Sequence, residues 1–265
     1  MKRFIPFATK GPVVGVIRLH GVIAAMSRGA GLNDAALAGV IERAFRKGKP
    51  KAIALAINSP GGSPSQSSLI AARIRRLAAE KEIPVYAFVE DLAASGGYWL
   101  ASAADEIWVD ENSIVGSIGV ISSGFGFHEF IARHGIERRV HTAGKSKSML
   151  DPFQPEKAAD IKRLKSLHGD IHDNFIAQVK ERRGAKLAEQ DLFTGEIWVG
   201  RKSIDVGLAD GVGHLVPVMK EKFGDKTRFV VHGQRRSLLN RIGMSVFGDI
   251  WAEAETRIGF AKYGI

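Results

Sequence analysis

Short apolar runs alternate with longer helical patterns in the first part of the chain. Strands are expected at 13–19, 52–57 and 85–89, where apolar and β-branched residues follow one another almost without a polar break. Helices are expected at 33–47, with Asn33 as the cap, and at 65–80, where apolar residues recur at helical spacing. This βαβαβ order predicts an α/β fold in which helices cover a core of parallel strands.

The pattern is less regular further along the chain. Short strands are expected at 107–109 and 139–141, flanking the glycine-rich stretch 116–126 and a helix through Phe130. A long amphipathic helix is predicted at 155–180, and a compact helical region at 204–218. We therefore divide the chain into an N-terminal segment (1–12), one large domain (13–222) and a C-terminal strand and helix extension (223–265).

Composition narrows the class of protein. The chain has 265 residues, of which 45% are hydrophobic, and these are enough to bury a proper core. Cysteine is absent, which excludes disulfides, thiolate nucleophiles and cysteine metal sites. We expect no membrane span, because each apolar run is far shorter than about 18 residues, and no secretory signal, because Pro6 and Lys10 interrupt the first apolar stretch. A cytoplasmic location is favoured.

The formal net charge of +10 is spread along the chain rather than gathered in one basic stretch. Without interleaved aromatic residues or a recognised motif, these charges predict solvated faces and no nucleic-acid partner. The stretch 235–263 differs, since Leu239, Ile242, Val246 and Ile250 recur at helical spacing after several arginines. It is a candidate for peripheral membrane contact, or for packing on the same chain or on a sister subunit.

Ser95 is the candidate nucleophile. It follows the apolar run 85–89 in the stretch Ala94-Ser95-Gly96-Gly97, where a buried strand is expected to turn into a helix. The two glycines let the backbone approach a substrate carbonyl, and the N-terminal end of a helix favours developing negative charge. The alternative is an ordinary strand-to-helix turn with a serine cap.

A second glycine turn, at 58–63, follows the preceding predicted strand. It lacks the lysine of a phosphate-binding loop and the spacing of a dinucleotide loop. The N–H groups of Gly62 and Gly96 would instead make the two-donor oxyanion hole that acyl transfer requires. The alternative is a helix-entry turn with glycine for tightness.

A serine nucleophile needs a base within hydrogen-bond reach. Of the histidines, His128 is the nearest downstream, but its neighbours suggest a helix surface. A lysine is the other route, because loss of hydration in an apolar pocket lowers a lysine pKa and leaves a neutral amine. Lys145 and Lys147 lie in the stretch 144–153, and their residue types alone do not rank one above the other.

Five stretches, at 58–63, 94–98, 116–120, 144–153 and 207–213, appear in the order and spacing of the signal peptide peptidase A family. The chain resembles this family of Ser-Lys proteases from about Val13 to Val218. The resemblance implies a fold of the Clp protease and crotonase type. It further implies that Ser95 is the nucleophile, Lys147 rather than Lys145 the general base, Ser117 the residue that orients the lysine amine, and Gly62 and Gly96 the oxyanion donors.

The same resemblance implies a serine endopeptidase that acts on signal-peptide remnants or other apolar, unfolded peptides without metal or cofactor. Family members assemble into rings in which two subunits can share a site, so a homo-oligomer is expected, with an octamer as one form. Many members carry an N-terminal membrane anchor, and the segment before Val13 is not suited to that role. The alternatives are a crotonase-like enzyme for acyl thioesters and a non-catalytic ring that captures or scaffolds peptides.

Overall fold

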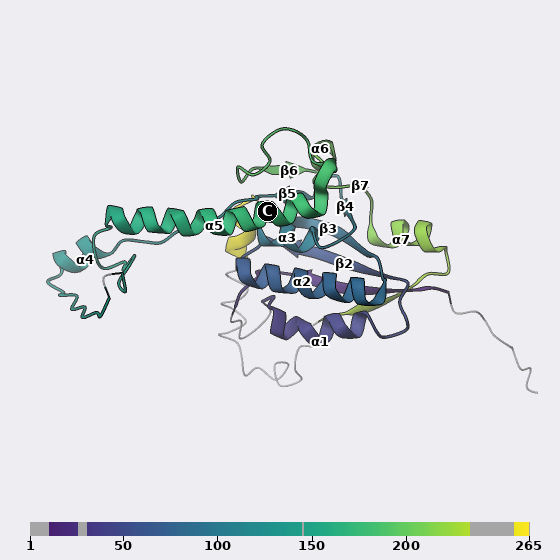
Figure 1. The fold of residues 1–265 in the computed structure, drawn as a ribbon, viewed down its shortest axis with the longest axis horizontal. Helices are drawn as coiled ribbons and strands as arrows, with labels where there is room; N and C mark the ends of the chain where they lie inside the picture. Colours follow the sequence, from purple (N-terminus) through teal and green to yellow (C-terminus); the bar gives the residue numbers. More distant parts are fainter. Residues whose placement is uncertain (1–10, 26–30, 145, 234–256, 265) are drawn as a thin grey trace, which may run out of the picture. The chain divides into compact units, whose positions relative to one another are not determined.

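The computed structural model describes residues 11–25, 31–144, 146–233 and 257–264. The chain divides into two units, each described here by itself. The first runs up to Ile118 and resumes at Ile176, and the second is Gly119–Phe175. The central sheet belongs to the first unit (Figure 1).

The sheet of the first unit is eight-stranded over the described residues and almost entirely parallel. Its main path runs β6-β5-β3-β2-β1-β8, with β4 beside β3 and β7 beside β4, and only β5 and β6 pair antiparallel. The strands are β1 (Val13–His20), β2 (Ala52–Ser59), β3 (Val85–Ala94), β4 (Glu106–Val109), β5 (Ile114–Gly116), β6 (Ile197–Val199), β7 (Gly211–Val212) and β8 (Arg228–His232). The predicted α/β class with a parallel core is confirmed.

Helices lie between the strands as the alternating pattern predicts. The Asn33 cap is confirmed, since its Oδ1 accepts from the Ala36 N–H at 2.9 Å. Within the first unit the helices are α1 (Asp34–Ala44), α2 (Pro64–Lys81), α3 (Gly96–Ala101), α6 (Arg201–Asp205) and α7 (Leu215–Phe223). The second unit contains α4 (His128–Arg133), and α5 (Ala158–Arg183) runs from the second unit into the first, where the 3₁₀ turn Gly184–Lys186 follows it.

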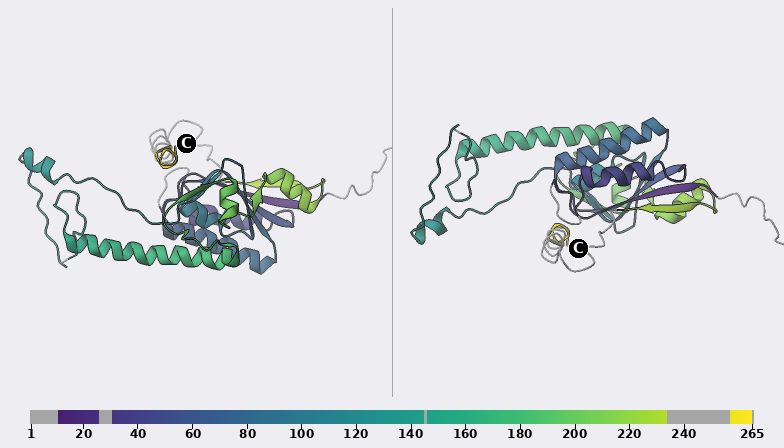
Figure 2. Two further views of the ribbon diagram at one scale, coloured as in Figure 1. Left: turned by 90° about the horizontal axis from the view of Figure 1, so that it is seen from above. Right: turned by 90° about the horizontal axis from the view of Figure 1, so that it is seen from below.

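Helices cover both faces of the sheet, which explains the unbroken apolar runs in its strands. Val16, Ala54 and Phe88 pack with Val218 and Met219 of α7 on one face. The opposite face receives α1, α2 and α3, with α1 beside α2 (Figures 1 and 2). Both faces of β1 and β2 are therefore buried, which is typical of a parallel core.

Three expectations need correction. The predicted strand at 139–141 is wrong, because this stretch of the second unit is irregular and mostly exposed. The region 204–218 is not purely helical, since β7 separates α6 from α7. Strand β3 continues past Val89 to Ala94, and between Val89 and Leu92 its partner changes from β4 to β5.

The C-terminal stretch is described only in part. β8 pairs in parallel with β1, so the residues directly after 222 contribute to the central sheet. Of the predicted helix at 235–263, residues 257–261 are helical, and 234–256 lie outside the described residues. No helix in the described ranges is long and apolar enough to cross a membrane.

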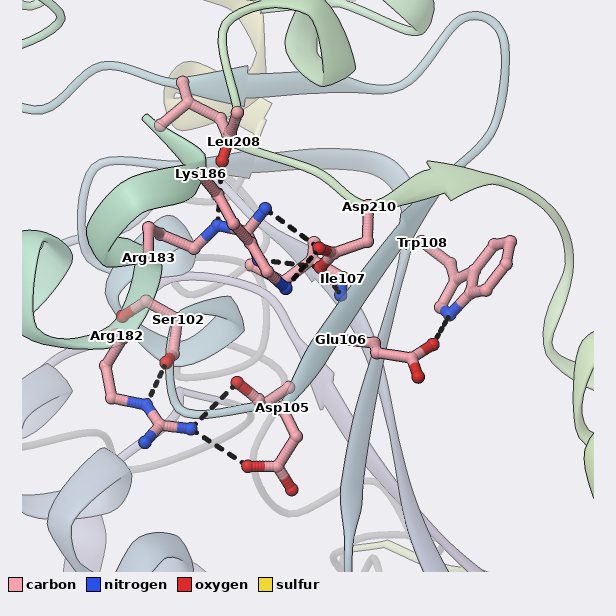
Figure 3. Close-up of polar contacts among 12 residues, drawn as sticks. Ser102, Asp105, Glu106, Ile107, Trp108, Arg182, Arg183, Lys186, Leu208 and Asp210 are labelled. Carbon is pink, nitrogen blue, oxygen red and sulfur yellow. Dashed lines mark hydrogen bonds and ion pairs between the residues drawn. The ribbon is translucent and has the colours of Figure 1, made fainter. Parts of the chain in front are cut away.

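A buried ion-pair cluster fixes the end of α5 to the stretch 207–213 (Figure 3). The Asp210 carboxylate accepts two hydrogen bonds from Arg183, at 2.6 and 3.2 Å, one from Lys186 at 2.6 Å and one from the Ile107 N–H at 2.7 Å. Burial by itself would raise the pKa of Asp210, but these donors together hold it below its usual value. The motif around Asp210 therefore serves the fold.

Candidate active site

Ser95 lies at the sharp turn between β3 and α3. Its backbone angles, φ +53° and ψ −123°, are costly for a residue with a side chain. This geometry resembles the strained strand-to-helix turn that presents a catalytic serine in other α/β enzymes. The side chain is partly exposed, while the glycines behind it are buried. The turn thus presents a hydroxyl on a rigid support.

The loop 58–63 packs directly against this turn. A Cβ added to Gly61 would lie 2.7 Å from the Gly96 nitrogen, and one added to Gly96 would lie 3.3 Å from the Gly62 nitrogen. A Cβ on Gly97 would collide with the carbonyl of Ser59. Glycine is therefore required at this junction so that the two backbones can approach each other. The approach brings the backbone of Gly62 close to that of Gly96, the residue after Ser95.

A buried hydroxyl holds the loop in place. The Ser59 Oγ donates to the Gly21 carbonyl at 2.7 Å and accepts from the Gly61 N–H at 3.2 Å. Ser59 is fully buried at the end of β2. Ser59 is not among the predicted site residues, although its place at the end of a buried strand, inside the glycine motif, is a signal that could identify it.

Ser117 joins the site through the pairing of β5 with the extended end of β3. The Ser95 N–H donates to the carbonyl of Gly116 at 2.8 Å, and Ala94 is in register with Gly116. Ser117 also has a positive φ, +52°, and its N–H donates to the Glu196 carbonyl at 2.6 Å. Backbone bonds at Gly116 and Ser117 therefore hold this segment next to the Ser95 turn.

Lys147 belongs to the second unit. Its backbone N–H donates to the Gly144 carbonyl at 3.2 Å, and its side chain is exposed. Ser95, Ser117, Gly62 and Gly96 come together within the first unit, whereas the candidate base is on a separate body. Four of the five predicted site residues are thus gathered by the fold of one unit.

Charged groups around the strand ends are paired. Glu90, at the irregular point of β3, lies 3.2 Å from His20, and the hydrogen bond from His20 holds the pKa of Glu90 below its usual value.

His128, the histidine considered as a base, lies 4.0 Å from Glu129 in the second unit. Among the described residues, no group of three histidine, aspartate or glutamate side chains is arranged to hold a metal ion.

A strained serine and a glycine loop packed against it at the strand ends of a parallel α/β core are typical of enzymes that use a serine nucleophile. Comparison with known proteins agrees: the model of peptidase family S49 matches residues 78–226, which include Ser95, Ser117 and Lys147. The chain belongs to peptidase family S49.

The chain is also similar in sequence to individual proteins. "Protease 4" of Haemophilus influenzae is 34% identical over 67% of this chain, and "Serine protease SPPA, chloroplastic" of Arabidopsis thaliana is 31% identical over 78% of it. A protein of Brucella melitensis named "Na(+)/H(+) antiporter NhaA" is 46% identical over the full chain. The chain spans 29%, 32% and 39% of the length of these three relatives, respectively.

The Ser59 support can be tested by substitution. Ser59→Ala leaves the Gly21 carbonyl and the Gly61 N–H without their present partner, so we expect a stability loss of about 1–3 kcal/mol and a lower kcat for peptide hydrolysis. Ser203→Ala is the matched control, because Ser203 is equally buried but lies in α6. Urea unfolding and steady-state kinetics measure both. A lower kcat in both variants would contradict a specific role for Ser59.

Proposed function

We propose that this chain is a serine endopeptidase with a Ser-Lys dyad. The Ser95 Oγ attacks a peptide carbonyl carbon while the neutral amine of Lys147 takes its proton, and Ser117 holds that amine in place. The N–H groups of Gly62 and Gly96 stabilise the tetrahedral oxyanion. The protonated lysine then gives its proton to the leaving amine, and water hydrolyses the acyl-enzyme by the same steps.

The observation that carries this proposal is the positive φ of Ser95 at the β3–α3 turn, with Gly62 and Gly96 packed beside it. Strain of this kind persists where the surrounding structure enforces it, and it is concentrated at functional sites. A crotonase-like thioester enzyme would need the oxyanion donors but not the strained serine. The backbone geometry therefore favours acyl transfer through a serine.

We further propose that copies of the chain assemble and that the base is desolvated in the assembly. Among the described residues, most of the exposed large apolar side chains belong to the second unit, which carries Lys147: Ile121, Phe125, Phe127, Phe130, Ile136, Leu150, Phe153 and Leu167. Apolar surface of this extent favours a protein interface. Burial there would supply the apolar surroundings in which a lysine amine works as a base.

The proposed substrates are extended, apolar peptides, including remnants of signal peptides. Such a peptide would bind in extended form at the Ser95 turn, where hydrogen bonds to its backbone give affinity without strong sequence preference. We propose no antiporter activity for this chain, which covers 39% of the length of the Brucella melitensis relative.

A fluorophosphonate probe tests the proposal, since it reacts much faster with an activated serine hydroxyl than with an ordinary one. We expect the wild-type protein to gain one adduct, mapped by peptide mass spectrometry to Ser95, and to release products from an apolar-rich peptide mixture. Ser95→Ala should do neither, while another partly exposed serine, such as Ser68, should remain unlabelled in both proteins. Cleavage that persists in Ser95→Ala would rule out this nucleophile.

A further inference from the structure

The two proposed oxyanion donors belong to different elements of the first unit. Among the described residues, neither the Gly62 N–H nor the Gly96 N–H donates a hydrogen bond. An oxyanion hole needs such unused donors, and it needs them at a fixed spacing, because preorganised donors cost no rearrangement when charge develops. The spacing of these two donors must therefore come from the groups packed around them.

Ile23 fixes the loop that carries Gly62. The Ile23 N–H donates to the Gly61 carbonyl at 2.8 Å, and the Ile23 carbonyl accepts from the Ser63 N–H at 2.7 Å. The residues on both sides of Gly62 are thus bonded to one residue, which is only 1% exposed. The Gly62 backbone is held against the interior of the first unit without use of its own N–H.

Ser67, near the start of α2, contacts both halves of the proposed oxyanion hole. It is fully buried, and its Oγ donates to the Ser63 carbonyl at 2.9 Å. A Cβ built on Gly96 would lie 2.4 Å from this Oγ, whereas the next nearest atoms, of Ile23 and Gly62, are at 3.2 and 3.3 Å. The Ser67 hydroxyl therefore bonds to the residue after Gly62 and packs directly against Gly96.

The bond that Ser67 makes within its helix does not by itself require a serine. A hydroxyl that bonds the carbonyl four residues earlier is a common way to satisfy a buried serine. The Ser67 N–H already donates to the same Ser63 carbonyl, at 3.0 Å. Alanine would suit the helix better and would bury no polar atom. What alanine lacks is the oxygen that fills the space against Gly96.

We propose that Ser67 is a positioning residue for peptide hydrolysis, and that its hydroxyl sets the spacing of the Gly62 and Gly96 donors. The inference rests on the proposed function, since the donors matter only where an oxyanion forms. Ser67 is fully buried and acts through its neighbours rather than on the substrate. Loss of its oxygen leaves a gap into which Gly96 can move, and a displaced donor stabilises the transition state less.

A pair of substitutions tests the placement without reference to activity. Gly96→Ala puts a Cβ 2.4 Å from the Ser67 Oγ, so we expect a lower urea midpoint of unfolding. Adding Ser67→Ala removes that oxygen, and the double variant should unfold at a higher urea concentration than Gly96→Ala alone. Gly97→Ala is the matched control, because its Cβ would meet the Ser59 carbonyl oxygen, 2.3 Å away, which Ser67→Ala does not relieve. Losses that simply add in Gly96→Ala/Ser67→Ala would overturn the placement.

The single variant Ser67→Ala tests the role in hydrolysis. We expect kcat for an apolar peptide to fall about tenfold while KM stays within about twofold of the wild-type value, because a displaced donor weakens binding of the transition state and not of the substrate. Ser68→Ala is the matched control, since Ser68 is the next residue of α2 and is partly exposed, and it should keep the wild-type kcat. An unchanged kcat in Ser67→Ala would overturn the role.

A peptide aldehyde separates positioning from a general loss of stability. When it binds, the Ser95 Oγ bonds to the aldehyde carbon, the serine proton passes to the base, and the carbonyl oxygen becomes an oxyanion like that of the reaction. The matching peptide alcohol binds without this step. We expect Ser67→Ala to weaken binding of the aldehyde about tenfold and of the alcohol less than about twofold. Equal losses for both ligands would show a structural role and overturn positioning.

The same two ligands distinguish failure of this inference from failure of the proposed function. A wild-type protein that neither hydrolyses peptide nor prefers the aldehyde to the alcohol would count against the Ser95 peptidase, and with it against any role of Ser67 in hydrolysis. A wild type that prefers the aldehyde, with the same preference kept in Ser67→Ala, would overturn the role of Ser67 alone.

Discussion

Peptide hydrolysis is expected to fall roughly 10³- to 10⁶-fold in both Ser95→Ala and Lys147→Ala, and no further in the double variant. The two side chains act in one step, since the proton that Ser95 loses is the proton that Lys147 gains. Removing either one therefore removes the same pathway. Steady-state rates on one apolar peptide, with circular dichroism to confirm folding, measure the three variants side by side.

Lys145→Ala is the matched control, because it removes the same charge from the same short stretch of sequence. We expect it to retain close to the wild-type rate. Equal losses in Lys145→Ala and Lys147→Ala would show that the stretch contributes general positive charge rather than one base. Losses that multiply in the Ser95→Ala/Lys147→Ala double variant would show that the two residues act independently.

The same two single variants distinguish a shared site from one completed within a chain. If neighbouring copies share the site, co-assembling Ser95→Ala with Lys147→Ala unites an intact serine with an intact lysine and restores part of the rate. If each chain completes its own site, the mixture remains inactive. The result therefore locates Lys147 relative to Ser95 in the working assembly.

The sequence predicted the approach of Gly62 to Gly96 because both glycine turns follow neighbouring parallel strands. Parallel strands end at the same edge of a sheet, so loops after β2 and β3 meet there. The role of Ser59 was missed because a buried serine has no periodic pattern of its own. Its importance comes from the carbonyl of Gly21 after β1, which only the folded chain brings within reach.

The place of Ser117 could not be predicted from the pattern of residues. Strand β5 has three residues, and the strand predicted at 85–89 stops short of Leu92–Ala94, the part of β3 that pairs with β5. In the structure, the Ser113 hydroxyl donates to the Val89 carbonyl at 3.0 Å and also bonds the carbonyl of Glu90, which supports the irregular point in β3. Tertiary bonds therefore carry the strand past its predicted end.

The error at 139–141 has the opposite cause. A single β-branched residue among arginines and histidine was interpreted as a strand, although a strand needs a partner to bond its backbone. No partner strand pairs with this stretch in the described part of the second unit.

The choice of Lys147 over Lys145 rests on family resemblance alone, because no residue pattern in the stretch 144–153 separates the two lysines.

Asp210→Ala is expected to cost about 3–5 kcal/mol of unfolding free energy, because it leaves a buried arginine without its counter-charge. The Arg183 side chain is only 2% exposed and donates two hydrogen bonds to Asp210. Lys186→Ala is the control: this lysine bonds the same carboxylate but is 50% exposed, so its loss should cost less than about 1 kcal/mol. Urea unfolding at neutral pH compares them.

The pH dependence provides a second, independent test of this cluster. Because the pKa of Asp210 is lowered in the folded chain, its ionised form stabilises the fold. This contribution is fully present above the ordinary aspartate pKa of about 4 and is lost as the pH falls through the lowered value. Asp210→Asn resembles the protonated carboxyl, so the stability difference between wild type and Asp210→Asn should shrink as the pH falls from about 4 to about 2. A constant difference across that range would show that the charge of Asp210 is not what secures α5 to the sheet.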